Sequence, residues 1–150
     1  MSPEQRLAIE WECTRLINLY ANLNDAGRWE AVAALYAEDG LMTRPTAPDA
    51  PVVGRKALRD SFLARPARAS RHVCANIVVD VESPAAASAF SVILLFTGTA
   101  DPAGGPASRD DSPPLVGTYR DRFVLTGEGW RFAERHGGLT FKPERVQTPT

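Results

Sequence analysis

The chain has 150 residues, a common size for one domain. Its 17 basic and 18 acidic side chains nearly cancel, which argues against a nucleic acid or an anionic membrane as partner, because either would need a clustered positive excess. No apolar run approaches the roughly 20 residues that span a bilayer, and the N-terminus lacks the pattern of a secretory signal. We therefore expect residues 1–150 to form a single cytoplasmic domain.

Cysteine usage excludes two further classes of protein. The chain contains only Cys13 and Cys74, with no Cys-x-x-Cys motif and no cluster of cysteine and histidine. A disulfide framework and a zinc site are both disfavoured by this pattern. We expect the protein to use no metal and no other cofactor.

The first part of the chain predicts three helices. Ser2-Pro3-Glu4 is a favourable helix start, and apolar or small residues then recur at helical spacing until Gly27, which can supply a left-handed terminal residue. A shorter helix begins at Trp29, with Val32, Leu35 and Tyr36 on one face. A third runs from Gly54 to about Leu63, before Pro66.

The period then changes from helical to two-fold, which predicts strands. Proline-rich residues 45–51 are expected to form an extended loop after a short strand at 41–43, and residues 101–114 a flexible loop. The tail, 143–150, is expected to be frayed. Long strands are predicted for residues 70–82, 87–99, 115–125 and 130–140.

Helices followed by strands predict an α+β fold, with the helices packed on one face of a strongly curved antiparallel sheet. Such a sheet encloses a pocket, the usual site for a small apolar ligand. Residues 87–99 are apolar on both faces, which predicts a helix layer on one side and a partner subunit on the other. We expect a homo-oligomer, a dimer or a trimer, formed through the outer sheet face around Phe90–Phe96.

Two positions carry candidate acid–base chemistry. His72 is one of only two histidines and lies near the start of a predicted strand, and Asp25 lies where the first predicted helix ends. A carboxylate bonded to one imidazole nitrogen stabilises the imidazolium and leaves the other nitrogen as a base. The alternative for His72 is a half-buried histidine with satisfied hydrogen bonds. His136 is expected at the surface.

Three segments carry a family resemblance. The first runs from Leu19 to Gly40 and contains Asn24-Asp25-Ala26-Gly27-Arg28-Trp29; the second is Ser70-Arg71-His72-Val73-Cys74-Ala75-Asn76-Ile77. The third joins Gly117-Thr118-Tyr119-Arg120-Asp121-Arg122-Phe123 to Gly129-Trp130-Arg131-Phe132-Ala133-Glu134-Arg135. Together they resemble SnoaL-like proteins of the nuclear-transport-factor-2-like superfamily. The resemblance implies a cone-shaped α+β barrel of the cystatin-like type.

Within this superfamily the sequence is similar to a branch with an Asp–His dyad, which includes scytalone dehydratase, hexachlorocyclohexane dehydrochlorinase and bile-acid 7α-dehydratase. The resemblance implies that Asp25 and His72 form the dyad, that Tyr20 acts with it, and that Arg135 on the last strand is also catalytic. The alternatives are a core position for Tyr20 and an ion pair of Arg135 with Glu134 or Asp121. The eliminating relatives favour a trimer over a dimer.

The sequence also departs from its relatives. Scytalone dehydratase has a second His, a Ser and an Asn that handle substrate and water. The comparable positions of this chain resemble Thr97, Arg120 and Arg122 instead, so that part of the apparatus is missing. The base of ketosteroid isomerase corresponds to Arg44, which disfavours that isomerase chemistry.

Four further residues are candidates for substrate binding. Asn76 could hydrogen-bond a ligand, although capping a backbone group is the alternative, and Trp29 could equally be a core residue. The remaining two, Phe62 and Phe96, are apolar residues of the third helix and of a long strand.

These observations favour a cofactor-independent lyase that acts by dehydratase-type elimination on a small apolar cyclic substrate. A polyketide-type cyclase or isomerase could use the same pocket. The third alternative is a ligand-binding or accessory protein without turnover. Because one scaffold hosts all three functions, the fold alone does not choose between them.

Overall fold

The computed structural model describes residues 1–141. Its helices are α1 (Pro3–Asp25), α2 (Trp29–Ala33) and α3 (Arg55–Leu63). The hydroxyl of Ser2 accepts the backbone N–H of Gln5, and the Gln5 side chain accepts the backbone N–H of Ser2. This capping box satisfies two backbone donors at the start of α1, so the predicted helix start is confirmed.

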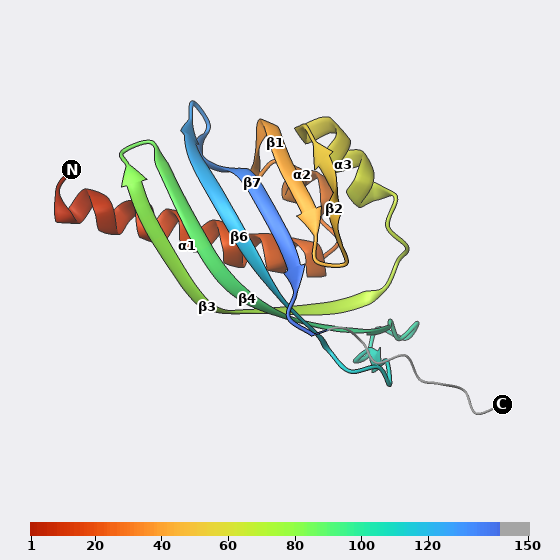
Figure 1. The fold of residues 1–150 in the computed structure, drawn as a ribbon. Coiled ribbons are helices and arrows are strands. Elements are labelled where there is room, and N and C mark those ends of the chain that lie inside the picture. Colours follow the sequence, from red (N-terminus) through yellow and green to blue (C-terminus); the bar gives the residue numbers. More distant parts are fainter. Residues whose placement is uncertain (142–150) are drawn as a thin grey trace.

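The strands are β1 (Tyr36–Arg44), β2 (Ala47–Val53), β3 (Ala69–Ser83), β4 (Ala86–Thr99), β5 (Ser108–Arg109), β6 (Leu115–Thr126) and β7 (Gly129–Leu139). They form one sheet in the spatial order β2-β1-β7-β6-β4-β3 (Figure 1), and β5 pairs with β4. All neighbouring strands of the described residues are antiparallel except β1 and β7, which run parallel. The predicted α+β fold with helices on a curved antiparallel sheet is confirmed, with this one parallel pair as an addition.

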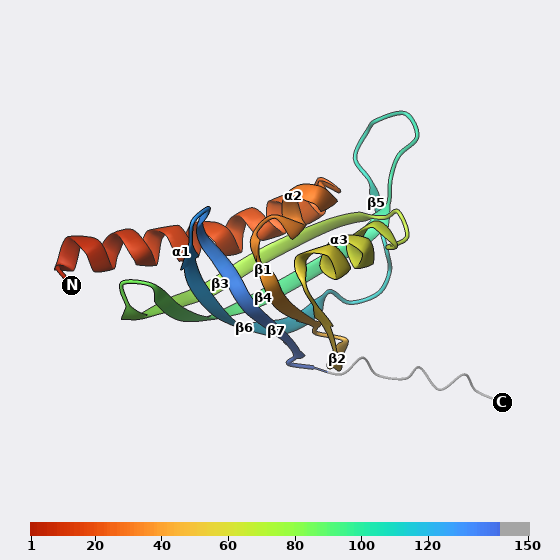
Figure 2. The same ribbon diagram turned by 90° about the horizontal axis from the view of Figure 1, so that it is seen from above.

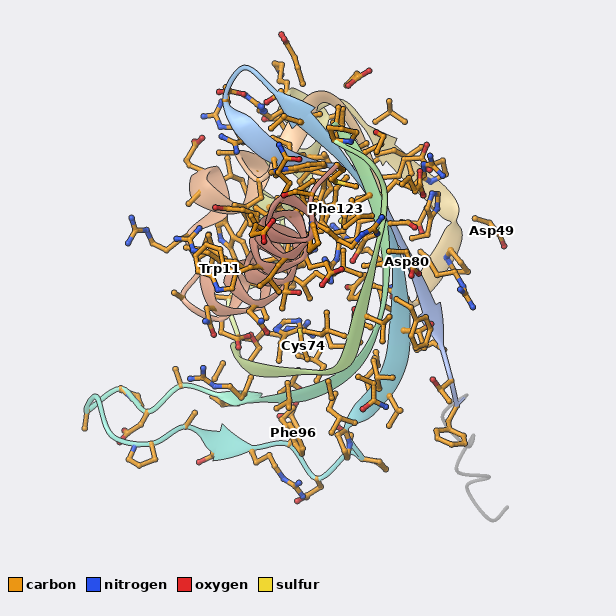
Figure 3. All side chains as sticks on the ribbon, turned by 90° about the vertical axis from the view of Figure 1, so that its left-hand side faces the viewer. Trp11, Asp49, Cys74, Asp80, Phe96 and Phe123 are labelled. Carbon is orange, nitrogen blue, oxygen red and sulfur yellow. The ribbon has the colours of Figure 1, made fainter. Side chains whose placement is uncertain are left out.

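The sheet curves around the helices, as predicted. Helix α1 lies along its concave face (Figure 2), and the core is formed where buried residues of α1 meet those of α2, α3 and the sheet. Cys74 and Phe123 lie on the concave side and Phe96 on the opposite side (Figure 3). The two-sided apolar character predicted for residues 87–99 is present, because Ile93 is buried inside while Phe96 is half-buried on the outer face.

Two short segments differ from the sequence-based expectation. The second helix ends at Ala33, and Tyr36, expected on that helix, begins β1. Residues 45–51, expected to be a loop, overlap β2. Proline removes a backbone donor, but β2 is an edge strand and has only one neighbour to bond, so Pro48 and Pro51 are tolerated there.

The predicted loop 101–114 contains local structure. Ser108 and Arg109 form β5, which pairs with Thr99 and Gly98 of β4. The hydroxyl of Thr97 also donates to Asp110 Oδ2, at 2.6 Å. The predicted loop therefore includes one short strand, and its flexibility stays a prediction. The predicted frayed tail, 143–150, lies outside the described residues.

In the part of the chain that the structure describes, no helix combines the length and the apolar character needed to cross a membrane.

Candidate functional site

A cavity of about 550 Å³ opens at the end of α1. Its wall is built from the α1–α2 connection, the segment that follows β1, the segment between α3 and β3, and the inner faces of β3, β4 and β6. The first of these segments contributes Asn24, Asp25 and Trp29. The predicted pocket is therefore present, and its wall carries both polar and apolar side chains.

Asp25 is the last residue of α1, a place where the helix dipole disfavours a carboxylate. The chain turns sharply here, because Gly27 adopts a positive φ of 64° and the backbone N–H of Arg28 bonds to the carbonyl of Leu23 at 2.9 Å. This turn leaves the Asp25 side chain buried against β3, where donors from that strand compensate for the unfavourable helix end.

His72 faces the cavity because of an irregularity in β3. Asn76 has a φ of 51°, and the pairing of β3 with β4 slips by one residue between Ala75 and Val78. Such a bulge reverses the alternation of side chains along a strand. His72 and Ile77 therefore both face inward, whereas strict two-residue alternation would place residues an odd number of positions apart on opposite faces.

The Asp25 carboxylate and the His72 imidazole are in direct contact. Nδ1 of His72 lies 2.5 Å from Oδ1 of Asp25, and both side chains are almost fully buried. Oδ2 accepts the backbone N–H of His72 at 2.8 Å, and Oδ1 also accepts the hydroxyl of Ser70 at 2.9 Å. The His72 N–H is free to do this because β3 is an edge strand with one uncovered side.

These donors determine the charge of Asp25. Burial alone would raise the pKa of its carboxyl, but the hydrogen bonds from the His72 ring, the His72 backbone and Ser70 outweigh burial and lower that pKa. Asp25 is therefore a carboxylate near neutral pH and can only accept hydrogen bonds. His72 Nδ1 must carry the proton, which leaves Nε2 as the ring nitrogen able to accept one.

The structure does not place Tyr20 and Arg135 on the cavity wall. Arg135 is fully buried, and its Nη1 donates to Asp121 Oδ2 at 3.3 Å, which is one of the ion pairs considered from the sequence. Tyr20 is a core residue whose hydroxyl lies 3.7 Å from the sulfur of Met42. The predicted catalytic group of four residues is therefore divided: Asp25 and His72 line the cavity, and the other two lie in the core behind it.

Of the four residues predicted to bind substrate, only Trp29 lines the cavity. Its ring stacks on Phe62, with 6.3 Å between centroids, so Phe62 supports the wall from the core. Asn76 lies exposed in the bulge of β3, and Phe96 lies on the outer face of the sheet. Neither Asn76 nor Phe96 therefore lines the cavity.

Several wall residues were not proposed as site residues from the sequence. Tyr119 lines the cavity, and its ring lies 3.9 Å from the guanidinium carbon of Arg135. Burial raises the pKa of Tyr119, so its hydroxyl stays protonated and can donate. Arg44 and Arg65 also line the cavity. Tyr119 shares its strand face with buried Asp121 and Phe123, and that two-residue spacing is the signal that could have placed it inside.

In residues 1–141, no group of three or more His, Cys, Asp or Glu side chains lies close enough together to hold a metal ion. The polar side chains that line the cavity include a carboxylate, an imidazole, a phenol and guanidinium groups, together with an amide and two hydroxyls. This set can exchange protons with a ligand and hydrogen-bond to it.

Helices packed in a curved sheet, with a cavity at the end of the first helix, define a domain of the nuclear-transport-factor-2-like type. The chain belongs to the SnoaL-like domain family, whose family model matches residues 5–136. No curated protein sequence matches the chain.

Solved structures share this fold. A provisionally assigned scytalone dehydratase from Novosphingobium aromaticivorans has a TM-score of 0.77 and 23% identity, over 97% of this chain and 94% of that one. A protein from the same organism, described as nuclear-transport-factor-2-like with a cystatin-like fold, has a TM-score of 0.72 and 26% identity, over 90% and 84%. A third structure, from Catenulispora acidiphila in complex with S-DNPA, has a TM-score of 0.67 and 22% identity, over 89% and 94%. Below 25% identity, such likeness shows the fold alone.

Proposed function

We propose that this protein is a cofactor-independent lyase that eliminates water, or a comparable leaving group, from a small cyclic substrate. The observation that carries the proposal is the 2.5 Å contact between His72 Nδ1 and Asp25 Oδ1 at the wall of the cavity. A buried carboxylate that holds one imidazole nitrogen orients the ring and leaves its other nitrogen able to act as a general base.

In the proposed reaction, Nε2 of His72 takes a proton from a carbon next to a carbonyl group. The electron pair of that C–H bond becomes the new C=C bond, and the hydroxyl on the neighbouring carbon leaves. The proton held by His72 is returned to the departing hydroxide, so water is the second product. Asp25 stabilises the imidazolium that exists between these two transfers.

Tyr119 is proposed to donate a hydrogen bond to the substrate carbonyl, where negative charge develops. Arg135 and Tyr20 act as positioning residues in this scheme, because the guanidinium carbon of Arg135 lies 3.9 Å from the Tyr119 ring and 4.4 Å from the Tyr20 ring. They hold the phenol from behind the wall and do not touch the substrate.

The test is turnover of His72→Ala and Asp25→Asn against a panel of cyclic β-hydroxy ketones and hydroxylated aromatic compounds. We expect His72→Ala to lower the rate by about 10²–10⁴-fold, the usual contribution of a general base. The matched control is His136→Ala, because His136 is the chain's other histidine and is exposed, with Nε2 2.8 Å from Glu134. It should retain full activity.

Unchanged turnover in both dyad variants would remove the dyad from the mechanism. Mass analysis of the product separates elimination from the alternative of ring closure or isomerisation, because a cyclase or isomerase gives a product of unchanged mass.

Assembly stays a prediction. We propose a homo-oligomer through the outer face of β4, where Phe90, Val92, Leu94 and Phe96 are half-buried in the single chain. Sedimentation as a monomer at micromolar concentration would contradict it.

A further inference from the structure

Arginines are concentrated on the cavity wall. Arg44, Arg65 and Arg68 line it, whereas Asp25 is the one carboxylate among the described wall residues. The whole chain has a net charge of −1, so this positive charge is local to the cavity. Asp25 is already bonded to His72 and Ser70. The wall therefore keeps an excess of positive charge that its own carboxylate does not balance.

Neutral groups hold the two arginines nearest the core. Nη2 of Arg44 donates to the carbonyl oxygen of Ser61 at 3.3 Å and to its hydroxyl at 3.1 Å. Nη1 of Arg65 donates to Oδ1 of Asn24 at 2.9 Å. Within residues 1–141, neither guanidinium forms an ion pair with a carboxylate. Each guanidinium carries five N–H donors, so both retain donors for a ligand.

The positions of both groups are fixed before any ligand arrives. The guanidinium carbon of Arg65 lies 4.7 Å from the Phe62 ring centroid and 5.6 Å from that of Trp29. Burial lowers the pKa of Arg44, and the positive charge of Arg65 lowers it further. The two guanidinium groups thus repel each other, and an anion bound to both would relieve that repulsion.

Another part of the wall is apolar. Ile93 and Leu95 of β4 and Leu115 of β6 line the cavity together with Trp29. A ligand that satisfies both parts of the wall needs an apolar ring and one compact anionic group. A carboxylate matches the planar fork of a guanidinium better than a spherical anion does.

We propose that the cavity selects small organic acids, with an apolar ring against Leu95 and Leu115 and a carboxylate held by Arg44 and Arg65. As a statement about the substrate, this inference rests on the proposed lyase function, in which His72 acts on the same ligand. It makes the substrate a cyclic hydroxy acid whose carboxylate anchors it beside the base.

Calorimetric titration of the intact chain with 1-naphthoate and with 1-naphthamide tests the proposal. The two probes share one apolar ring system and differ in charge. We expect naphthoate to bind about tenfold more tightly or better, since hydrogen bonds between charged partners are worth at least that factor. The preference should fall as salt concentration rises, while naphthamide binding stays constant.

Variants locate the carboxylate. Arg44→Met and Arg65→Met should each weaken naphthoate binding by about tenfold and change naphthamide binding by less than about twofold. Arg65→Lys keeps the charge and should retain part of the preference. The control is Arg59→Met, because Arg59 lies on α3 and pairs with Glu30 at 2.6 Å, away from this wall. It should bind both probes as the wild type does.

Equal affinity for the two probes, or an equal loss of both in the Arg variants, would overturn the inference. The salt series on the wild type decides the question even if a methionine variant fails to fold. Neither probe can undergo elimination, so the binding result is independent of the turnover result in the lyase test. A preference for naphthoate with undiminished turnover in His72→Ala overturns the lyase and keeps the acid site. Equal binding of the two probes, together with turnover that His72→Ala abolishes, overturns the acid site and keeps the lyase.

Discussion

Asp25 and Asp121 are both buried, but their surroundings shift their pKa values in opposite directions. The side chain of Asp25 is 4% exposed and that of Asp121 is 0% exposed. Asp25 accepts hydrogen bonds from the His72 ring, the His72 backbone and Ser70, and its pKa is lowered. Asp121 has one partner, Arg135 at 3.3 Å, and its Oδ1 has no hydrogen-bond partner in residues 1–141. Burial raises the pKa of Asp121 to about 6, against the opposing charge of Arg135.

The difference shows that burial does not by itself decide the charge of a carboxyl group. The number and geometry of the hydrogen-bond donors around the carboxyl group decide its charge. Asp25 is held as a carboxylate, the form that can orient His72. Asp121 lies close to the point at which it takes up a proton.

The largest expected effect comes from removing the partner of Asp121. Arg135→Met leaves Asp121 buried without an opposite charge, and loss of one partner of a buried ion pair destabilises by about 3–5 kcal/mol. We expect that loss of unfolding free energy at pH 8. At pH 5 it should be smaller, because protonation of Asp121 removes the unpaired charge. Urea unfolding of the wild type and the variant at both pH values measures the difference.

The sign follows from linkage. The pKa of Asp121 is raised in the folded state, so the native protein binds more protons than the unfolded chain between pH 3.8 and about 6. The stability of the wild type should therefore fall as pH rises through this window. The control, Asp121→Asn, should lack that fall. Equal destabilisation of Arg135→Met at pH 5 and pH 8 would mean that Asp121 is not the group left unpaired.

Asp25→Asn is expected to have the next largest effect. An amide cannot accept from all three donors as the carboxylate does, and hydrogen bonds to a charged group contribute about 1.5–3 kcal/mol each. We expect a loss of stability of about that size at pH 7. Because the folded-state pKa of Asp25 is lowered, this contribution is complete above its ordinary value of 3.8 and is lost as pH falls through the folded-state pKa.

Thermal unfolding of the wild type and Asp25→Asn between pH 7 and pH 3 tests the prediction. The two curves should converge at the acid end. Asp80→Asn is the control, since Asp80 lies exposed on the same strand and should leave stability unchanged throughout. A gap that stays constant down to pH 3 would show that the charge of Asp25 contributes nothing.

Much of the fold could be predicted because its signals are periodic. The helical spacing of Cys13, Leu16 and Leu23 predicted α1, and two-residue alternation predicted the long strands. Tyr36 was assigned to the wrong element because a short apolar segment fits either period. Strand β2 was missed because its prolines exclude only a central strand, and its place at the sheet edge depends on tertiary structure.

The site was less accessible to sequence reasoning. The contact between Asp25 and His72 was implied by family resemblance, since the two residues are 47 positions apart in the chain. Strict two-residue alternation predicts that His72 and Ile77 face opposite sides of the sheet. The bulge at Asn76 adds one residue to the strand, and no periodic pattern in the sequence marks that addition. Arg44 and Arg65 join the cavity from separate segments, and no local pattern marks two arginines that share a wall.

The smallest expected effect isolates one donor to Asp25. Ser70→Ala removes the hydroxyl 2.9 Å from Oδ1 and keeps both contacts from His72. We expect the pKa of Asp25 to rise toward its ordinary value, and stability to fall by about 0.5–1.5 kcal/mol at pH 7, the usual contribution of one hydrogen bond. Carboxyl carbon NMR through an acid titration measures the pKa directly. Ser88→Ala, on the outward face of β4, is the control and should change neither quantity. If Ser70→Ala leaves the Asp25 pKa where it is, the contacts from His72 alone keep this carboxylate charged, and the contrast with Asp121 depends on the dyad rather than on the number of donors.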